Sequence, residues 1–207
     1  INFFIKDKIF TDNLKNINKD YGKRPKGYPE LKNKKIIIDY TDPNILKEFH
    51  IGHLMSNVIG ESIARLYEAQ GAEVKRANYQ GDVGLHVAKA IGGLGGPYKE
   101  EFYELMKFGG ILKEKVALLG LAYTYGALNY EQDEDTKKLI NSINKQIYDK
   151  YFSQKKANPL LDFYEQSRQW SLDYFEQVYG RLGMKLQKNG KYFDFYFFES
   201  KTGERGK

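Results

Sequence analysis

The sequence predicts an α/β fold with a parallel sheet near the start of the chain and helices dominating later. Three observations support it: the β-branched run Ile36-Ile37-Ile38, a helical apolar pattern over residues 53–69, and a second strand-like segment over residues 73–79. A strand, a helix and a strand within about 40 residues form a βαβ unit, whose strands run parallel.

The first strand and helix have simple sequence signatures. The run 36–38 is typical of a strand buried on both faces. In the following helix, apolar residues at three- and four-residue spacing predict the buried face: Leu54, Val58, Ile59, Ile63 and Leu66. Small residues, Ser56, Gly60 and Ala64, allow close packing, and Gly71 is expected to cap the helix.

After Gly81-Asp82-Val83-Gly84 the chain is expected to be mainly helical. Residues 133–152 place Leu139, Ile140, Ile143, Ile147 and Tyr151 on one face, and residues 160–181 do the same with Phe163, Trp170, Tyr174 and Val178. Residues 192–198 predict an exposed edge strand with three phenylalanines, Phe193, Phe195 and Phe197, on one face. Trp170, Tyr174 and the aromatic run 193–198 are interpreted as core.

The composition limits the class of protein. Among 207 residues, 41% are hydrophobic and 15% aromatic, which argues against disorder. No apolar run approaches the roughly 20 residues that span a bilayer, and no secretory signal opens the chain, so no membrane is expected. The absence of cysteine excludes disulfides and thiolate metal sites and fits a cytoplasmic protein.

The positive charge lies at the start of the chain. Residues 1–35 contain ten Lys and Arg against four Asp and Glu, which equals the whole net charge of +6. A basic segment beside a neutral body indicates a polyanionic partner, although a solvated lysine-rich linker fits equally well. Both ends of the sequence are abrupt, so a fragment is expected.

Two of the three histidines stand three residues apart, at His50 and His53. They open the first helix beyond a strand end, where ligands of α/β sheets bind and where unpaired N–H groups attract phosphate. Gly52 allows a base or ribose to approach the backbone. The pattern suits a nucleoside triphosphate; the alternative is that the histidines only cap the helix. No metal site is expected, because no third ligand stands at helical spacing.

The surrounding sequence, "IIIDYTDPNILKEFHIGHLMSNVIGESIARLYEAQGAEVKRANYQGDVGLHVAKAI", resembles the signature region of arginyl-tRNA synthetases. These are class I enzymes with a nucleotide-binding fold. "WSLDYFEQVYGRLGMKL" and "FDFYFFES" are similar to later parts of the same catalytic domain. The resemblance implies a Rossmann-like parallel sheet over residues 36–207, the first half of the domain with a helical insertion. Residues 1–35 are similar to the tail of an N-terminal tRNA-binding domain plus a linker.

The resemblance also implies roles for the segment Pro43 to His53. His50, Gly52 and His53 match the HIGH motif, which in this family binds ATP and stabilises the transition state. Lys47 matches a lysine just before this motif that, in this family, assists at the phosphates of ATP. A solvated loop lysine is the alternative for this residue.

Two further residues match positions that hold the amino-acid substrate. Asp39 and Asn44 fall where the family holds the α-amino group of arginine, and both side chains can accept hydrogen bonds from an ammonium group. A strand-end acid and a turn residue are the respective alternatives. Val83 replaces the tryptophan of the family's G-D-W-G, and His86 is interpreted as part of a pocket wall.

The implied activity is that of an arginine–tRNA ligase. L-arginine attacks ATP, with Mg²⁺ bound to the ATP, and the arginyl group then passes to its tRNA. A monomer is expected. The alternatives are a small H-x-G-H nucleotidyltransferase and a non-catalytic RNA-binding module. No residue matches the family's guanidinium-reading groups or its KMSKS-like loop, so the isolated chain is expected to be inactive and poorly soluble.

Overall fold

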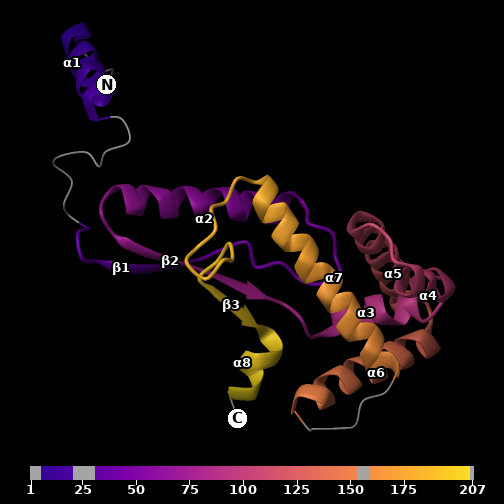
Figure 1. Cartoon of the computed structure of the whole chain (residues 1–207). Helices are drawn as coiled ribbons and strands as arrows, with labels where there is room; N and C mark the ends of the chain where they lie inside the picture. The colour runs from indigo at the N-terminus through magenta and orange to yellow at the C-terminus, as the bar shows by residue number, and fades with distance from the viewer. Residues whose placement is uncertain (1–5, 21–30, 153–158, 206–207) are drawn as a thin grey trace.

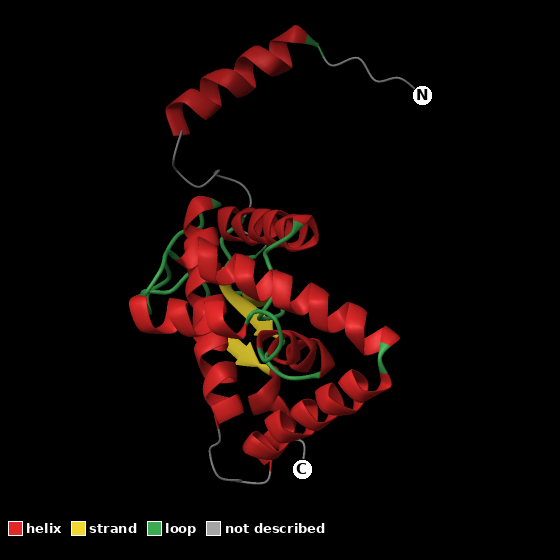
Figure 2. Cartoon of the chain, turned by 90° about the vertical axis from the view of Figure 1, so that its right-hand side faces the viewer, coloured by secondary structure: helices red, strands yellow, loops and turns green. Residues whose placement is uncertain are grey.

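The computed structural model describes residues 6–20, 31–152 and 159–205, which form three strands and eight helices (Figures 1 and 2). In chain order these are α1 (Asp7–Asp20), β1 (Lys35–Asp39), α2 (Ile51–Ala69), β2 (Glu73–Gln80), α3 (Leu85–Leu94), α4 (Lys99–Phe108), α5 (Leu112–Gln132), α6 (Glu134–Phe152), α7 (Pro159–Arg181), β3 (Phe195–Phe198) and α8 (Glu199–Arg205).

The three strands form one parallel sheet in the order β1-β2-β3. Ile36 pairs with Val74, and Ala77 pairs with Phe195, so the predicted parallel βαβ unit is confirmed. In Figure 1, α2 lies along one face of the sheet, and α3 to α6 gather beyond the carboxyl ends of the strands. This arrangement places the loop after β1 between the sheet and the helices.

The predicted last strand is shorter than expected. It begins at Phe195, because Phe193 is fully buried before the strand, with its ring 5.0 Å from the ring of Tyr40 and 5.1 Å from that of Tyr179. Within the described residues β3 pairs only with β2, so it is an edge strand as predicted. Phe195 and Phe197 are 42% and 44% exposed, so the interpretation of the whole aromatic run as core is wrong for these two.

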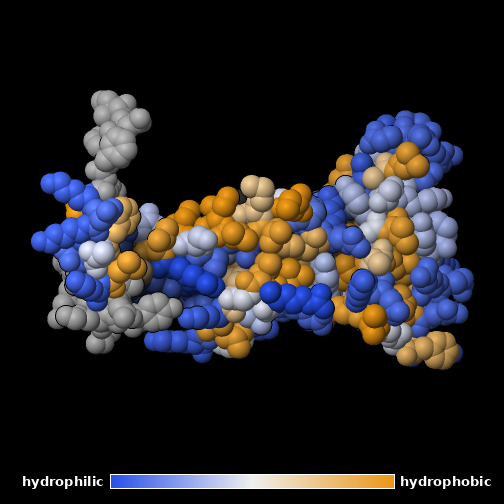
Figure 3. Space-filling view, turned by 90° about the horizontal axis from the view of Figure 1, so that it is seen from above, coloured by the Kyte–Doolittle hydropathy of each residue, from blue (hydrophilic) through white to orange (hydrophobic). Residues whose placement is uncertain are grey.

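The prediction of which face of α2 is buried is also wrong. Of the predicted apolar face, Leu54 is half-buried, but the other four residues point outward and belong to a hydrophobic stripe along the helix (Figure 3). The stripe consists of Ile51, Met55, Val58, Ile59, Ile63 and Leu66. Small and polar residues face the sheet instead: His53, Asn57, Gly60, Glu61 and Ala64.

The strand below explains the orientation of α2. Arg76 of β2 is 3% exposed and points toward the helix, where it requires acidic partners. Its Nε donates to Glu61 at 2.8 Å and its Nη1 to Glu68 at 2.7 Å. Burial disfavours the charge of Glu61, but hydrogen bonds from Arg76, Tyr40 and Arg65 outweigh burial and lower its pKa. The ion pairs therefore require the polar side of α2 to face the sheet.

The first strand is not buried on both faces, contrary to the sequence-based expectation. Ile37 is 66% exposed on the sheet face opposite α2, while Ile36 and Ile38 pack toward the helix with Val74 and Ala64. The continuous apolar run predicts a strand that is buried on both faces. Described residues cover only the face of β1 that contacts α2.

The helices beyond the sheet enclose the main core. In α6, Ile140, Ile143 and Ile147 are buried as predicted, but Leu139 is 56% exposed. Trp170 of α7 is buried, with its ring 5.1 Å from that of Phe102, which confirms its assignment to the core. Tyr174 packs against the same core, and the side chain of Tyr151 lies outside the described residues.

Glycine permits the closest helix crossing. A Cβ atom added to Gly126 of α5 would lie 1.9 Å from the carbonyl oxygen of Lys89 in α3. The two backbones therefore meet directly, which sets the distance between α3 and α5.

The N-terminal segment contributes one helix. Ile9, Phe10 and Leu14 of α1 are exposed, and residues 21–30, including Lys23, Arg24 and Lys26, lie outside the described part of the chain. The domain boundary at residue 35 stays a prediction. None of the described helices is long and apolar enough to cross a membrane.

Candidate active site

The loop between β1 and α2 carries the candidate motif in a fixed conformation. Thr41, Asp42 and Leu46 all have positive φ, which non-glycine residues rarely adopt. The backbone N–H of Ile45 donates to the carbonyl of Gly81 at 3.1 Å, and that of Leu46 donates to Ser171 Oγ at 3.0 Å. Hydrogen bonds that the loop donates to Gly81, just after β2, and to Ser171 of α7 therefore hold the strained loop in place.

The two histidines form a stacked pair at the start of α2. Their ring centroids are 3.8 Å apart, and His50 is the N-cap residue. Nδ1 of His50 accepts from the backbone N–H of Gly52 at 3.1 Å, while Nδ1 of His53 accepts from the N–H of His50 at 3.4 Å. The capping role that the sequence left open is thus present.

Capping determines which nitrogen can act on a ligand. Because Nδ1 accepts a hydrogen bond in both rings, these contacts assign the proton of each neutral imidazole to Nε2. Burial, followed by the charges of His50 and Lys47, lowers the pKa of His53 to about 4. At neutral pH His53 is therefore an uncharged hydrogen-bond donor, and His50 is the exposed member of the pair.

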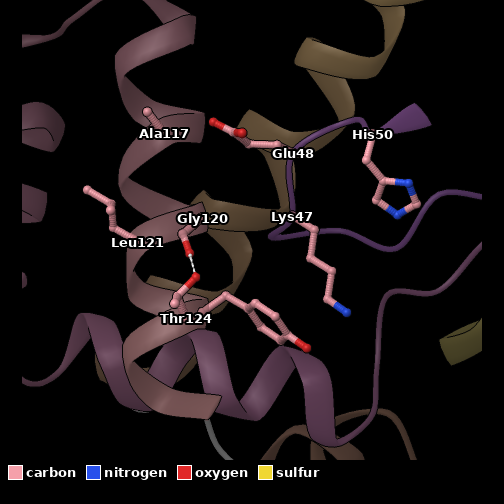
Figure 4. A pocket seen from close by; sticks show the side chains of 8 residues that line it. Lys47, Glu48, His50, Ala117, Gly120, Leu121 and Thr124 are labelled. Atoms are coloured by element: carbon pink, nitrogen blue, oxygen red, sulfur yellow. Dashed lines mark hydrogen bonds between the residues drawn. The ribbon is translucent and has the colours of Figure 1, made fainter. Parts of the chain in front are cut away.

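Lys47 lies with His50 at a cavity of about 510 Å³ between the motif loop and α5 (Figure 4). Its Nζ stands 4.2 Å from the ring centroid of Tyr123, and it forms no ion pair with any described carboxylate. Gly120 faces Glu48 across the cavity, since an added Cβ there would lie 3.5 Å from Glu48 Cγ. A half-buried cation beside two imidazoles favours an anion at this end of the site.

Carboxylates gather at the other side of the loop. Asp39 ends β1 and is exposed, and Asp42 lies beside it. Burial and the neighbouring charge of Asp39 raise the pKa of Asp42, although the backbone N–H of Tyr79 donates to Asp42 Oδ1 at 2.8 Å. Asp42 was not predicted as a site residue; its signal was its position in the loop after a strand end.

Asn44 is placed by direct contact between two loops. It forms an isolated parallel bridge with Gly81, and a Cβ atom on Gly81 would lie 2.1 Å from Asn44 Oδ1. Glu199 Oε2 lies 3.6 Å from the same point, so this carboxylate joins Asn44 at the strand ends. Burial and the charge of Asp82 raise the pKa of Glu199. Glu199 was not predicted as a site residue, although it directly follows β3.

The residues of the G-D-V-G segment are structural. Asp82 is fully buried and accepts from Ser200 N, Ser200 Oγ and Arg168 Nε at 2.9, 2.8 and 3.0 Å. Val83 is buried in the main core, at the position of the family's tryptophan. His86 Nε2 lies 3.4 Å from the carbonyl of Gly81, and burial lowers its pKa. None of the described cavities is lined by His86, so its interpretation as part of a pocket wall stays a prediction.

A parallel sheet followed by a helix whose N-terminus carries the H-x-G-H pair defines an α/β domain of the class I nucleotide-binding type. The model of the family "tRNA synthetases class I (R), catalytic domain" matches residues 16–193. The chain therefore belongs to the arginyl class I tRNA synthetase family.

Individual relatives agree with this assignment. The chain is 35% identical over 197 residues to an arginine--tRNA ligase of Prochlorococcus marinus, covering 93% of this chain and 29% of that protein. It is 32% identical over 188 residues to that of Wigglesworthia glossinidia brevipalpis, covering 91% and 30%. A probable mitochondrial arginine--tRNA ligase of Mus musculus is 30% identical over 207 residues, covering 97% and 32%.

The fold also has a solved counterpart. The crystal structure of arginyl-tRNA synthetase from Plasmodium falciparum matches with a TM-score of 0.51 and 23% identity, covering 95% of this chain and 30% of that one. The chain spans about 30% of the length of the curated relatives it matches. Membership of this family argues against the small nucleotidyltransferase and the non-catalytic RNA-binding module.

Proposed function

We propose that the chain forms the ATP-binding part of an arginine–tRNA ligase, which activates L-arginine with ATP and transfers it to tRNA. The observation that carries the proposal is the stacked pair of His50 and His53 at the N-terminus of α2, with Lys47 on the same loop. The family of the chain supports the same activity.

In this proposal the triphosphate of ATP binds at the start of α2. The helix N-terminus offers partial positive charge, and Lys47 adds a full charge. His50 and His53 donate through Nε2 to phosphate oxygens as charge develops on the α-phosphate. Gly52 has no side chain, and the His50 imidazole packs against its backbone, where an added Cβ would lie 3.0 Å from His50 Cε1.

The carboxylates bind the amino acid. Asp39 and Asn44 accept hydrogen bonds from the α-ammonium of arginine. Asp42 and Glu199 extend the negative charge at the strand ends, which favours a second cationic group on the same substrate. The carboxylate of arginine can then face the phosphates held by Lys47.

The remaining partners follow from the proposed reaction. The tRNA accepts the arginyl group on its terminal ribose, and the basic residues of segment 1–35 contact its backbone. Mg²⁺ accompanies the ATP phosphates; the described residues contain no group of three His, Cys, Asp or Glu placed to hold a metal ion. A monomer in the cytoplasm remains part of the proposal.

The variant His50→Asn distinguishes the role of His50 as N-cap residue from its proposed role in catalysis. In His50→Asn the new side chain is a strong N-cap and keeps α2 intact, but the Nε2 donor is lost. In the complete protein encoded by the gene, arginine- and tRNA-dependent ATP–pyrophosphate exchange should fall about 10²–10³-fold. Lys138→Met, at an exposed lysine on α6, is the control and should retain full exchange.

The double variant His50→Asn/His53→Gln with unchanged exchange would contradict the proposed role of the histidines. Exchange that depends on a small acceptor rather than on arginine and tRNA would contradict the proposed reaction itself.

A further inference from the structure

A second cavity, of about 280 Å³, lies between α7 and the edge of the sheet. Its wall includes Gln80, Leu172, Asp173, Glu176, Lys191 and Phe198. The cavity is separate from the histidine site, because α7 stands between them. Ser171 on one flank of α7 bonds the motif loop, while Leu172 and Asp173 on the other flank line this cavity.

The interior of the cavity offers unused hydrogen-bond acceptors. Gln80 is 2% exposed, and its Oε1 accepts no hydrogen bond of ordinary length from a described residue; the hydroxyl of Tyr179 is the neighbouring donor within the protein. The amide can rotate to exchange its oxygen and nitrogen, so the acceptor can turn toward a ligand. Glu176 accepts from the hydroxyl of Tyr196 through Oε1 at 2.5 Å, which leaves Oε2 for a second donor. A buried acceptor without a partner is unfavourable, and a ligand carrying several N–H groups would satisfy both residues.

The rim of the cavity carries both signs of charge. Asp173 and Lys191 are exposed, and Lys191 forms no ion pair with a described carboxylate. These two groups match the ammonium and carboxylate of a free amino acid. Leu172 and Phe198 supply apolar surface between the rim and the interior, which suits a methylene stem. The volume lies just below the range of drug-sized ligand sites and suits a molecule of amino-acid size.

We propose that this cavity binds a free basic amino acid. Lys191 pairs with its carboxylate, Asp173 with its α-ammonium, and Glu176 and Gln80 with the cationic end of its side chain. This site is additional to the arginine position proposed at Asp39 and Asn44, and it does not depend on that position.

Titration of the complete protein encoded by the gene with three amino acids tests the proposal. L-arginine and L-lysine should produce a saturable NMR shift of the Gln80 side-chain amide, while citrulline, which lacks the side-chain charge, should not. Glu176→Gln and Lys191→Ala should each weaken arginine binding about tenfold or more, since each removes a charged contact. Agmatine, which lacks the carboxylate, should be insensitive to Lys191→Ala. Asp135→Asn, at an exposed acid of α6, is the matched control.

Equal shifts with arginine and citrulline would overturn the proposal, as would unchanged affinity in both charge variants. If Glu176→Gln unfolds because Tyr196 loses its partner, Asp173→Asn and Lys191→Ala decide the result. Asp39→Asn should leave this binding unchanged. Loss of all arginine binding in Asp39→Asn would show that the amino acid binds only at the motif site, which would refute this proposal and leave the proposed function standing.

Discussion

Gly60 of α2 faces the ring of Tyr40, and its replacement by alanine tests how α2 sits on the sheet. An added Cβ would lie 2.3 Å from Tyr40 Cγ, where ordinary contact begins near 3.4 Å. The ring has to move by more than 1 Å, yet its hydroxyl is bonded to Glu61 at 2.7 Å and its face packs on Phe193. Such overpacking costs about 3 kcal/mol. Alanine recovers about 1 kcal/mol through its helix propensity, so Gly60→Ala should lower the free energy of unfolding by about 2 kcal/mol.

The matched control is Gly120→Ala in α5. A Cβ there would meet Glu48 Cγ at 3.5 Å, which is an ordinary contact, so only the propensity gain of about 1 kcal/mol remains. Urea unfolding should therefore show changes of opposite sign for the same chemical substitution. In thermal unfolding each kcal/mol corresponds to about 2–4 °C for a chain of this size.

A double-mutant cycle isolates the contact itself. In a Tyr40→Ala background the penalty of Gly60→Ala should disappear, because the ring is gone. Equal stabilisation by Gly60→Ala and Gly120→Ala in the native background would refute the reasoning, since α2 would then not touch Tyr40 through Gly60.

Three further outcomes are expected. Arg76→Met removes the buried cation that pairs with Glu61 and Glu68, while Arg65 still bonds Glu61, so the free energy of unfolding should fall by about 3 kcal/mol in urea titrations. Lys138→Met on an exposed pair should change it by less than about 0.5 kcal/mol. His53 takes up a proton near pH 4 in the folded chain but near pH 6.5 in the unfolded chain, so the free energy of unfolding should fall as the pH decreases from 6.5 to 4. His53→Gln should remove that part of the pH dependence. An unchanged pH profile in this variant would contradict the lowered pKa of His53. Replacing three basic residues of the N-terminal segment by Ser should flatten the salt dependence of tRNA binding by about 0.9 per lost phosphate contact, and an unchanged slope would identify the segment as a solvated linker. These residues are Lys23, Arg24 and Lys26.

The sequence contained enough information for the parallel pair β1 and β2 but not for the packing of α2. Periodicity identified α2, α6 and α7, because each helix covers enough residues to repeat its pattern, while the run Ile36-Ile37-Ile38 identified β1. The predicted orientation of α2 on the sheet was nevertheless wrong. An apolar stripe normally faces the core, but Arg76 on the neighbouring strand requires Glu61 and Glu68, and no periodicity in α2 reveals a requirement set by β2.

The candidate site shows the same limit. The spacing of His50 and His53 located the motif, and local chain geometry was sufficient for that. Glu199 joins Asn44 only because β3 pairs with β2, and Tyr123 meets Lys47 only because glycine permits α5 to approach α3. Contacts between residues so distant in sequence are set by the three-dimensional fold, and a single sequence does not display them.

The carboxylate of Asp82 has a consequence for the order in which the chain acquires its structure. Its partners Arg168 and Ser200 follow 86 and 118 residues later. At translation rates of about 5–20 residues per second, Ser200 is synthesised on the order of 10 s after Asp82. During that interval the carboxylate of Asp82, which is completely buried in the folded chain, lacks these donors, so the corner beneath Asn44 and Gly81 closes only after Ser200 has been synthesised. A nascent chain that stops before residue 200 would contain the complete histidine motif, while the carboxylate of Asp82 would still be exposed to water.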